Sequence, residues 1–345
     1  MHMDDIPPVF VFSTGRCGST MISEMLNRHP DILSLSEFFS VLGLNAFSGK
    51  KVTGDRMWQL YSRPGKRMAV VAQESFSELL YPFDDPGARF NADTLPPIMA
   101  VTLPHLTNRY EALYDEIRQF TCAQPEMLCR DHYRLLFSWL GERLGKKLWV
   151  ERHGGSLIMA SRLLRHFPEA RVVHVFRDGR ETTLSMSNHP PFRITLALIH
   201  RARRLGIDLC RLLERVEHSD RLTSMIGGSQ WLLSDIGNLL SERPELSEVA
   251  RFWSNMIETG HRVFGHFGPD RLLDLRFEDM QENSEREARR LIEFISPESD
   301  NEAWIREVAR IPRQTRSRFA LLDPDMQRAV TEACRPGLKI LDYAM

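Results

Sequence analysis

The chain has 345 residues, a formal net charge of −1 at pH 7 and 42% hydrophobic residues, enough to bury a substantial core. This length favours a single α/β domain with sizeable insertions over two full domains. The balanced charge gives no global basic field, which argues against nucleic-acid binding. No apolar run is long enough to span a membrane, and the five cysteines lack metal-ligand spacing. We therefore expect a soluble, cytoplasmic protein.

The first motif is a strand, a glycine loop and a helix. The apolar run Val9–Phe12 predicts a strand buried on both faces of a parallel sheet. Gly15 and Gly18 mark a tight loop, and apolar residues at helical spacing then predict a helix that begins near Ser19. The free N–H groups and the dipole of a helix N-terminus favour an anion there. The layout is typical of a phosphate-binding loop.

The loop differs from the Walker A loop of nucleotide triphosphatases. A Walker A loop carries Lys directly before its Ser/Thr, whereas Gly18 precedes Ser19 here. The only cation of the loop is Arg16, whose guanidinium can fork onto a phosphate-like group. The sequence thus predicts phosphate binding without the usual lysine, and without magnesium.

A less regular stretch, broken by prolines, runs from Phe38 to Arg130 and predicts a cap rather than a sheet. Its aromatic residues either line an acceptor pocket or pack in a core: Trp58, Tyr61, Phe76, Tyr81 and Phe83.

The sheet pattern then resumes. Residues 131–144 predict a helix, Leu148–Glu151 a strand, Arg152–Gly155 a turn, 156–167 a helix and Arg171–Phe176 a second strand. Ligands sit at the carboxyl ends of strands in open parallel sheets, so the turn at 152–155 is a candidate site.

A second motif follows the strand at 171–176. Arg177 leaves the strand, and Ser185, eight residues later, lies about a turn into the next helix. Both side chains can converge on one phosphate from two directions.

Further elements are expected towards the C-terminus. The predicted helices are 198–216, 231–240 and 246–264, and the predicted strand is 271–276. Ser284 and Glu287 match a capping box before a helix that runs to Ile295.

Together the motifs resemble the sulfotransferases that use 3′-phosphoadenosine 5′-phosphosulfate (PAPS). The resemblance rests on Arg16-Cys17-Gly18-Ser19-Thr20, Asn27-Arg28-His29-Pro30, Glu37, Arg177 and Ser185, and is closer to the protein-tyrosine and bacterial branches than to the cytosolic type. It implies a P-loop-containing nucleotide hydrolase-like three-layer fold, with a central, mostly parallel sheet flanked by helices. It also implies one sulfotransferase domain over residues 1–345, with cap or acceptor-binding insertions at about 38–130 and 190–269.

The resemblance also assigns the donor site. The loop residues Arg16, Cys17, Gly18, Ser19 and Thr20 would hold the 5′-phosphosulfate, and Arg177 and Ser185 the 3′-phosphate. A late basic loop covers the 3′-phosphate in the family. Arg313, Arg316 and Arg318 are candidates for it here, with a solvated face as the alternative.

Four residues are candidates for catalysis. Arg16 would neutralise the bridging oxygen, assisted by Arg152, which lies 25 residues before Arg177, where a protein-tyrosine sulfotransferase has a catalytic lysine. Glu37 lies 21 residues after Arg16, the offset of the catalytic glutamate in that branch. A carboxylate is a weak base in water, so this role requires a desolvated pocket. His153 is the rival base.

The predicted function is transfer of the sulfuryl group of PAPS to a hydroxyl of a small-molecule, lipid or carbohydrate acceptor, with no metal. A kinase-like phosphotransferase and a non-catalytic nucleotide-binding module on the same fold are the alternatives. Two departures from the family bear on the catalytic details: Cys17 replaces the common Ser, and Arg152–Gly155 replaces a Lys-centred turn.

Overall fold

The computed structural model describes residues 6–64, 79–204, 206, 243–298 and 301–344. The chain forms two compact units. Unit 1 comprises residues 1–34, 145–188 and 244–345, and unit 2 comprises 35–144 and 189–243. The expected helix 231–240, the end of the expected helix 198–216 and Phe76 lie outside the described residues.

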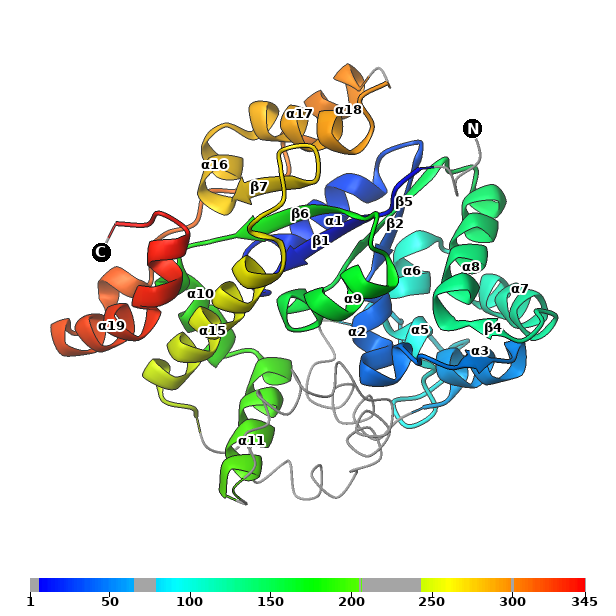
Figure 1. Ribbon diagram of the computed structural model, residues 1–345, viewed down its shortest axis with the longest axis horizontal. Helices are drawn as coiled ribbons and strands as arrows, with labels where there is room; N and C mark the ends of the chain where they lie inside the picture. The colour runs from blue at the N-terminus through cyan, green and yellow to red at the C-terminus, as the bar shows by residue number, and fades with distance from the viewer. Residues whose placement is uncertain (1–5, 65–78, 205, 207–242, 299–300, 345) are drawn as a thin grey trace. The chain divides into compact units, whose positions relative to one another are not determined.

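A five-stranded sheet is the centre of unit 1, and its strand order is β2-β5-β1-β6-β7. The strands are β1 (Val9–Ser13), β2 (Ile32–Ser36), β5 (Leu148–Arg152), β6 (Arg171–Phe176) and β7 (Leu272–Arg276). Strand β1 pairs in parallel with β5 and β6, and β6 pairs in parallel with β7. Figure 1 shows the sheet with helices around it. The predicted mostly parallel α/β architecture is confirmed.

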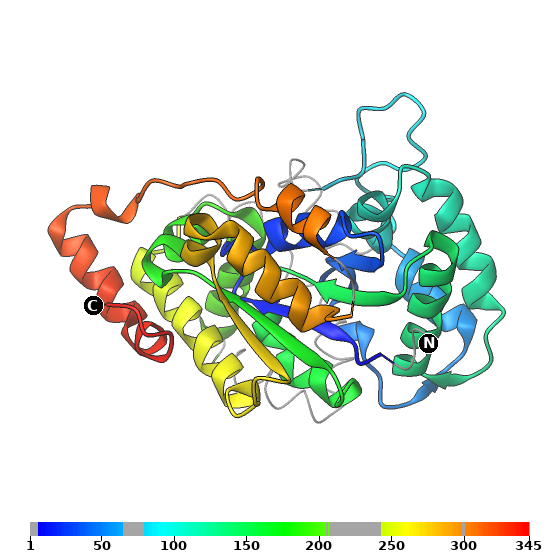
Figure 2. The same cartoon turned by 90° about the horizontal axis from the view of Figure 1, so that it is seen from above.

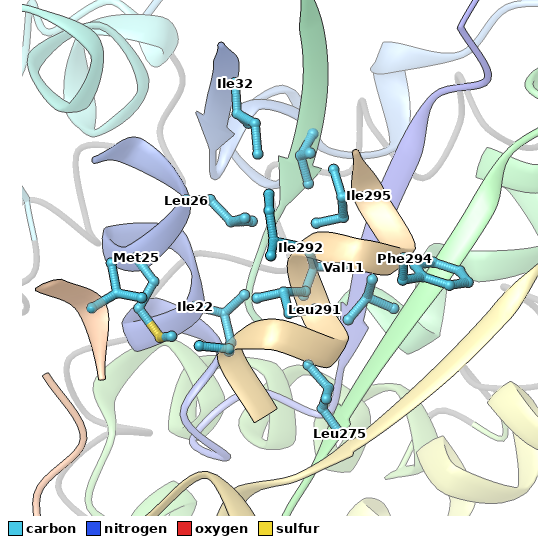
Figure 3. Packing of buried hydrophobic residues seen from close by; sticks show 14 of the residues in the cluster. Val11, Ile22, Met25, Leu26, Ile32, Leu275, Leu291, Ile292, Phe294 and Ile295 are labelled. Carbon is cyan, nitrogen blue, oxygen red and sulfur yellow. The ribbon is translucent and has the colours of Figure 1, made fainter. Parts of the chain in front are cut away.

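Both faces of the sheet are covered. Successive residues of β1 point to opposite faces, so β1 packs against helices on each side. Val11 belongs to a core cluster with residues of α1 (Ser19–Asn27), α17 (Ser284–Ile295) and α18 (Glu302–Val308). Figure 3 shows this packing. On the other face, the Phe10 ring lies 5.4 Å from Phe167, and the Phe12 ring 5.7 Å from Phe264. This double burial is the reason for the continuous apolar run at 9–12.

Unit 1 contains further helices. They are η4 (Ser156–Met159), α9 (Ala160–His166), α10 (Gly179–Ser187), α15 (Leu246–Phe264), α16 (Phe277–Glu282), η6 (Phe319–Leu321) and α19 (Pro324–Ile340). Helix α15 packs against α10 and α19.

Unit 2 is mainly helical. Its elements are α2 (Phe38–Leu42), η2 (Gly43–Ala46), β3 (Lys51–Val52), α3 (Gly54–Ser62), α5 (Pro97–Ala100), α6 (Thr102–Leu106), α7 (Tyr110–Cys122), β4 (Met127–Leu128), α8 (Cys129–Leu144) and α11 (Pro190–Arg204). Its core is aromatic: the Phe38 ring lies 4.9 Å from Phe137, and Phe39 lies 5.0 Å from Tyr133. Tyr61 and Tyr81 are buried, as the packing interpretation of these aromatic residues predicts.

Two local expectations need correction, and one strand was not expected. The helix expected over 156–167 is a 3₁₀ turn, η4, followed by α9. Strand β2 was not predicted. The capping box is wrong, because Ser284 is already helical and its Oγ donates to the Met280 carbonyl at 2.8 Å. Helix α16 ends only two residues earlier, which brings that carbonyl within reach. The Glu287 carboxylate is buried and pairs with arginines instead.

Gly18 is the tightest position of the first loop, and it yields a stability prediction. Its φ is +89°, and an added Cβ would lie 2.4 Å from Cδ2 of Phe277. Gly145 has a φ of +68° but open space around its Cβ position, so it is a matched control. We expect Gly145→Ala to cost about 1–2 kcal/mol of unfolding free energy from backbone strain alone. Gly18→Ala should cost roughly 1–3 kcal/mol more, because the Phe277 ring must move. Urea unfolding of both variants measures the difference, and equal losses would contradict the close approach.

Candidate functional site

The loop between β1 and α1 bends through the left-handed region of backbone conformation. Gly15, Arg16 and Gly18 have φ values of 77°, 57° and 89°. Gly18 is the N-cap of α1 and makes no side-chain hydrogen bond, and the first turn of α1 holds no acidic residue. The first-turn amides and the helix dipole therefore form a site suited to an anion.

Hydrogen bonds hold the start of this loop. The Ser156 hydroxyl accepts from the amide of Ser13 at 2.9 Å and lies 3.3 Å from the Val11 carbonyl, to which it can donate. The Gly15 amide donates to Oγ of Ser13 at 3.1 Å. The turn after β5 thus fixes the point at which β1 ends.

Cys17 anchors the middle of the loop. Its thiol is fully buried and lies 3.2 Å from the Val175 carbonyl on β6, to which it donates. Burial raises the pKa of the Cys17 thiol, so it stays protonated. The Cys17 side chain therefore belongs to the fold, and its backbone amide is the group available to a ligand. Ser19 is buried at the start of α1, and Thr20 is exposed beside it.

The two predicted phosphate motifs meet directly. Nε of Arg16 donates to Oγ of Ser185 at 3.1 Å, although the residues are 169 positions apart. Arg16 is exposed, and Ser185 lies on α10, the helix that follows β6. The loop after β1 and the helix after β6 thus converge at one edge of the sheet.

Arg177 lies close to the same loop through Phe277. Its guanidinium carbon is 4.7 Å from the centre of the Phe277 ring, the ring that approaches Gly18. Its Nη2 donates to Oγ1 of Thr315 at 3.3 Å and is 4.0 Å from a carboxylate oxygen of Glu181. The Arg177 side chain is 13% exposed, so a phosphate could reach it while its stem remains packed.

The neighbouring arginine, Arg180, is already paired. Its Nη2 donates to Oδ2 of Asp178 at 2.6 Å, and this bonding raises the pKa of Arg180. Asp178 also caps α10 by accepting from the Arg180 amide at 2.8 Å. Arg177 has no comparably close carboxylate partner among the described residues, and is the better candidate for an external anion.

A buried polar group ends β5. Glu151, Arg152 and His153 are each no more than 3% exposed. Nδ1 of His153 lies 3.1 Å from both carboxylate oxygens of Glu151. A carboxylate only accepts hydrogen bonds, so Nδ1 of His153 carries the hydrogen. Arg152 is in register with Val11 of β1, one strand from the loop.

Glu37 belongs to unit 2, where it follows β2 and is the N-cap of α2. Its φ is 60°, and it is one of three non-glycine residues with positive φ in the described part of the chain; the others are Arg16 and Asp342. Such conformations cost free energy and cluster at functional sites. Two of the three are residues that the sequence singled out.

Arg313, Arg316 and Arg318 are exposed in the irregular segment between α18 and η6 (Figure 2). Sequence reasoning missed three residues around Arg177: Phe277, Thr315 and Glu181. Glu181 follows Arg177 by four positions, but Arg177 precedes the N-cap Asp178 and lies outside α10, so no helix-face spacing marks the pair. Thr315 and Phe277 are brought to Arg177 by the tertiary fold.

The described residues offer neither a metal site nor a membrane-spanning helix. They contain no group of three or more His, Cys, Asp or Glu side chains arranged to hold a metal ion. None of their helices is long and apolar enough to cross a membrane.

Several solved structures are similar to the chain at low sequence identity. The sulfotransferase domain of the Synechococcus PCC 7002 olefin synthase is 17% identical, with a TM-score of 0.42, and the match covers 99% of this chain and 90% of that one. The sulfotransferase domain from the curacin biosynthetic pathway is 13% identical, with a TM-score of 0.49 and 99% coverage of both chains. Sulfotransferase STF9 from Mycobacterium avium is 16% identical, with a TM-score of 0.44, 99% coverage of this chain and 78% of that one.

Among curated proteins, no sequence matches the chain. A family model does match, namely that of the sulfotransferase family, over residues 7–195. The matched region is more than half of the chain and includes the loop at 15–20, Glu37, the end of β5 and the Arg177–Ser185 motif. The chain belongs to the sulfotransferase family.

Proposed function

We propose that this sulfotransferase takes the sulfuryl group from PAPS and transfers it to a hydroxyl group. The observation that carries the proposal is the hydrogen bond between Arg16 and Ser185, which joins the two phosphate motifs. PAPS has phosphate groups at both its 5′ and 3′ positions, so a donor of this kind needs two anion sites at one edge of the sheet.

The loop favours PAPS over ATP as the donor. A kinase loop places a lysine on the β- and γ-phosphates and a hydroxyl on Mg²⁺. Here Ser19 follows Gly18 where a kinase loop has its lysine, and Arg16 supplies the cation. Arg177 and Ser185 give the second anion site, for which ATP has no 3′-phosphate.

Each residue has a role in this proposal. The amides of residues 16–20 and the hydroxyls of Ser19 and Thr20 hold the 5′-phosphate, and Arg177 and Ser185 hold the 3′-phosphate. Arg16, assisted by Arg152, neutralises the bridging oxygen as negative charge develops there. The acceptor oxygen forms a bond to sulfur while the bond from sulfur to the bridging oxygen breaks. The acceptor proton passes to a base, and adenosine 3′,5′-bisphosphate (PAP) leaves.

Glu37 is the proposed base, and His153 is the rival. The left-handed backbone of Glu37 is a strained conformation of a kind that clusters at functional sites, and this supports the assignment. The Glu151–His153 pair is a buried carboxylate–imidazole pair, an arrangement that orients a general base in other enzymes. The two candidates predict different mutant kinetics.

We further propose that residues 1–345 act as one sulfotransferase domain, in which unit 2 supplies acceptor selectivity. All of its described helices except α11, and its aromatic core, lie in the stretch of sequence between the loop and β5, where the sheet pattern is interrupted. A small-molecule, lipid or carbohydrate hydroxyl is the proposed acceptor, in the cytoplasm and without a metal ion. We therefore expect the protein to bind the adenine nucleotide PAP in the presence of a chelator, with no metal ion.

The donor site predicts a specific loss for Arg177→Ala. PAP should bind the unaltered protein more tightly than adenosine 5′-phosphate does, and without Mg²⁺. Arg177→Ala should weaken PAP binding by roughly ten- to a hundredfold, from the loss of about 1.5–3 kcal/mol of charge-assisted hydrogen bonding, with little effect on adenosine 5′-phosphate. Calorimetry with each nucleotide measures both affinities.

Arg171→Ala is the matched control, because Arg171 begins β6 at the opposite end of the same strand and packs on Phe294. It should leave PAP affinity unchanged. If a folded Arg177→Ala protein binds PAP as tightly as the unaltered protein does, then the site of the 3′-phosphate lies elsewhere. Tight binding of ATP with Mg²⁺, and none of PAP, would favour the phosphotransferase.

The base assignment predicts a kinetic difference. Glu37→Gln keeps the side-chain size and should preserve PAP affinity, while turnover falls by ~10²–10⁴-fold. His153→Asn keeps an N–H group near Glu151 and should cost less. Turnover is measured with saturating PAPS once an acceptor is known. If Glu37→Gln keeps near-normal turnover and His153→Asn abolishes it, then His153 is the base.

A further inference from the structure

An extended segment passes Arg177 on its way from α18 to α19. Residues 313–319, which we call the strap, bond to the rest of unit 1 at three places, and Figure 2 shows this stretch as the orange connection between the two helices. At the first place, Nε2 of Gln281 donates to the Arg313 carbonyl, and Nε2 of Gln314 donates to the Gln281 carbonyl at 3.1 Å. At the second, Thr315 accepts from Arg177 at 3.3 Å.

Glu181 makes the third and strongest connection. Its Oε1 accepts from Oγ of Ser317 at 2.6 Å and from the amide of Phe319 at 2.9 Å. Hydrogen bonds to an ionised acceptor are short and about twice as strong as neutral ones. One carboxylate oxygen thus gathers a side chain and a backbone amide from the end of the strap.

The surroundings of Glu181 make burial of its carboxylate costly in free energy. The residue is 9% exposed on α10, and its Oε2 is buried with no hydrogen-bond donor among the described residues. That oxygen is 4.0 Å from Nη2 of Arg177, which is too far for a hydrogen bond. A buried carboxylate beside a proposed phosphate site is unfavourable twice, by desolvation and by charge repulsion. A compensating structural role is therefore required.

We infer that Glu181 is a positioning residue that fixes the strap beside Arg177 and thereby sets the preference for a nucleotide with a 3′-phosphate. We call the attachment of the strap to Glu181 the anchor. The identity of the ligand rests on the proposed function, whereas the anchor does not depend on it. With the strap fixed, Thr315 holds the Arg177 guanidinium against Phe277. With the strap released, Arg177 loses that partner and becomes mobile.

Two substitutions separate the anchor from the charge. Glu181→Gln keeps an oxygen that can accept from Ser317 and Phe319, and it removes the negative charge. Glu181→Ala removes both. Glu332→Ala is the matched control, since Glu332 is an exposed helical glutamate on α19 paired with Arg335.

The rate of cleavage by trypsin tests the anchor without any ligand, because Arg316 and Arg318 are exposed cleavage sites within the strap. We expect Glu181→Ala to be cut at these two residues about tenfold faster or more than the unaltered protein, since two charge-assisted bonds no longer oppose local opening. Glu181→Gln should be cut at an intermediate or unaltered rate, and Glu332→Ala at the unaltered rate. Mass spectrometry of the fragments identifies the cut residue.

Calorimetry measures how the substitutions change the affinities for PAP and adenosine 5′-phosphate. Glu181→Ala should lose most of the preference for PAP over adenosine 5′-phosphate, about tenfold, while binding of adenosine 5′-phosphate is kept. Glu181→Gln should keep the preference or increase it. If Glu181→Ala does not fold, Ser317→Ala replaces it, because it deletes one of the two donors and leaves the carboxylate; faster cutting at Arg316 and Arg318 supports the anchor.

Two outcomes overturn the inference. Equal cutting of the strap in Glu181→Ala and the unaltered protein would show that the strap does not depend on Glu181. Tighter PAP binding by Glu181→Ala than by Glu181→Gln would make Glu181 a competitor of the phosphate rather than an anchor. Failure of every variant, and of the unaltered protein, to bind PAP would refute the proposed function, while the cutting rates would still decide the anchor.

Discussion

The parallel pairing of β1 with β5 on one side and β6 on the other is the constraint on which the rest of the site depends. Parallel strands end at the same edge of a sheet, so this pairing brings together the loop after β1, the turn after β5 and the motif after β6. Burial of both faces of β1 holds it in register. Val11 packs on one face and Phe12 on the other, so a slip by one residue would exchange their faces.

The arginines at this edge differ in their hydrogen-bond partners. Asp178 neutralises Arg180 and caps α10, so that pair belongs to the fold. Arg16 donates to the hydroxyl of Ser185, and Arg177 donates to that of Thr315 and lies 4.0 Å from a carboxylate oxygen of Glu181. A hydroxyl holds a guanidinium in place without cancelling its charge, which suits arginines that exchange a neutral partner for a phosphate.

Much of this arrangement follows from the sequence, and the reasons differ from element to element. The strand at 9–12 and the helix at 246–264 are predictable because their strong apolar patterns identify them without knowledge of tertiary contacts. Strand β2 is harder to predict, since Ile32–Ser36 is only five residues long and two of its five buried residues are serines. The capping box failed because the end of α16 lies close enough to offer Ser284 another partner. Glu181 and the strap are invisible in the sequence, because their bonds join residues more than a hundred positions apart.

The central claim is that the family's chemistry, with PAPS as donor, is carried out at this edge of the sheet, and transfer of labelled sulfur from PAPS tests it most directly. The protein is incubated with PAPS labelled in the sulfuryl group, a chelator and either a broad set of hydroxyl compounds or a cell extract. We predict that label moves to an acceptor, and that Arg16→Ala largely abolishes the transfer. Repeated absence of transfer by a protein that binds PAP tightly would contradict the claim and indicate a nucleotide-binding module without this activity.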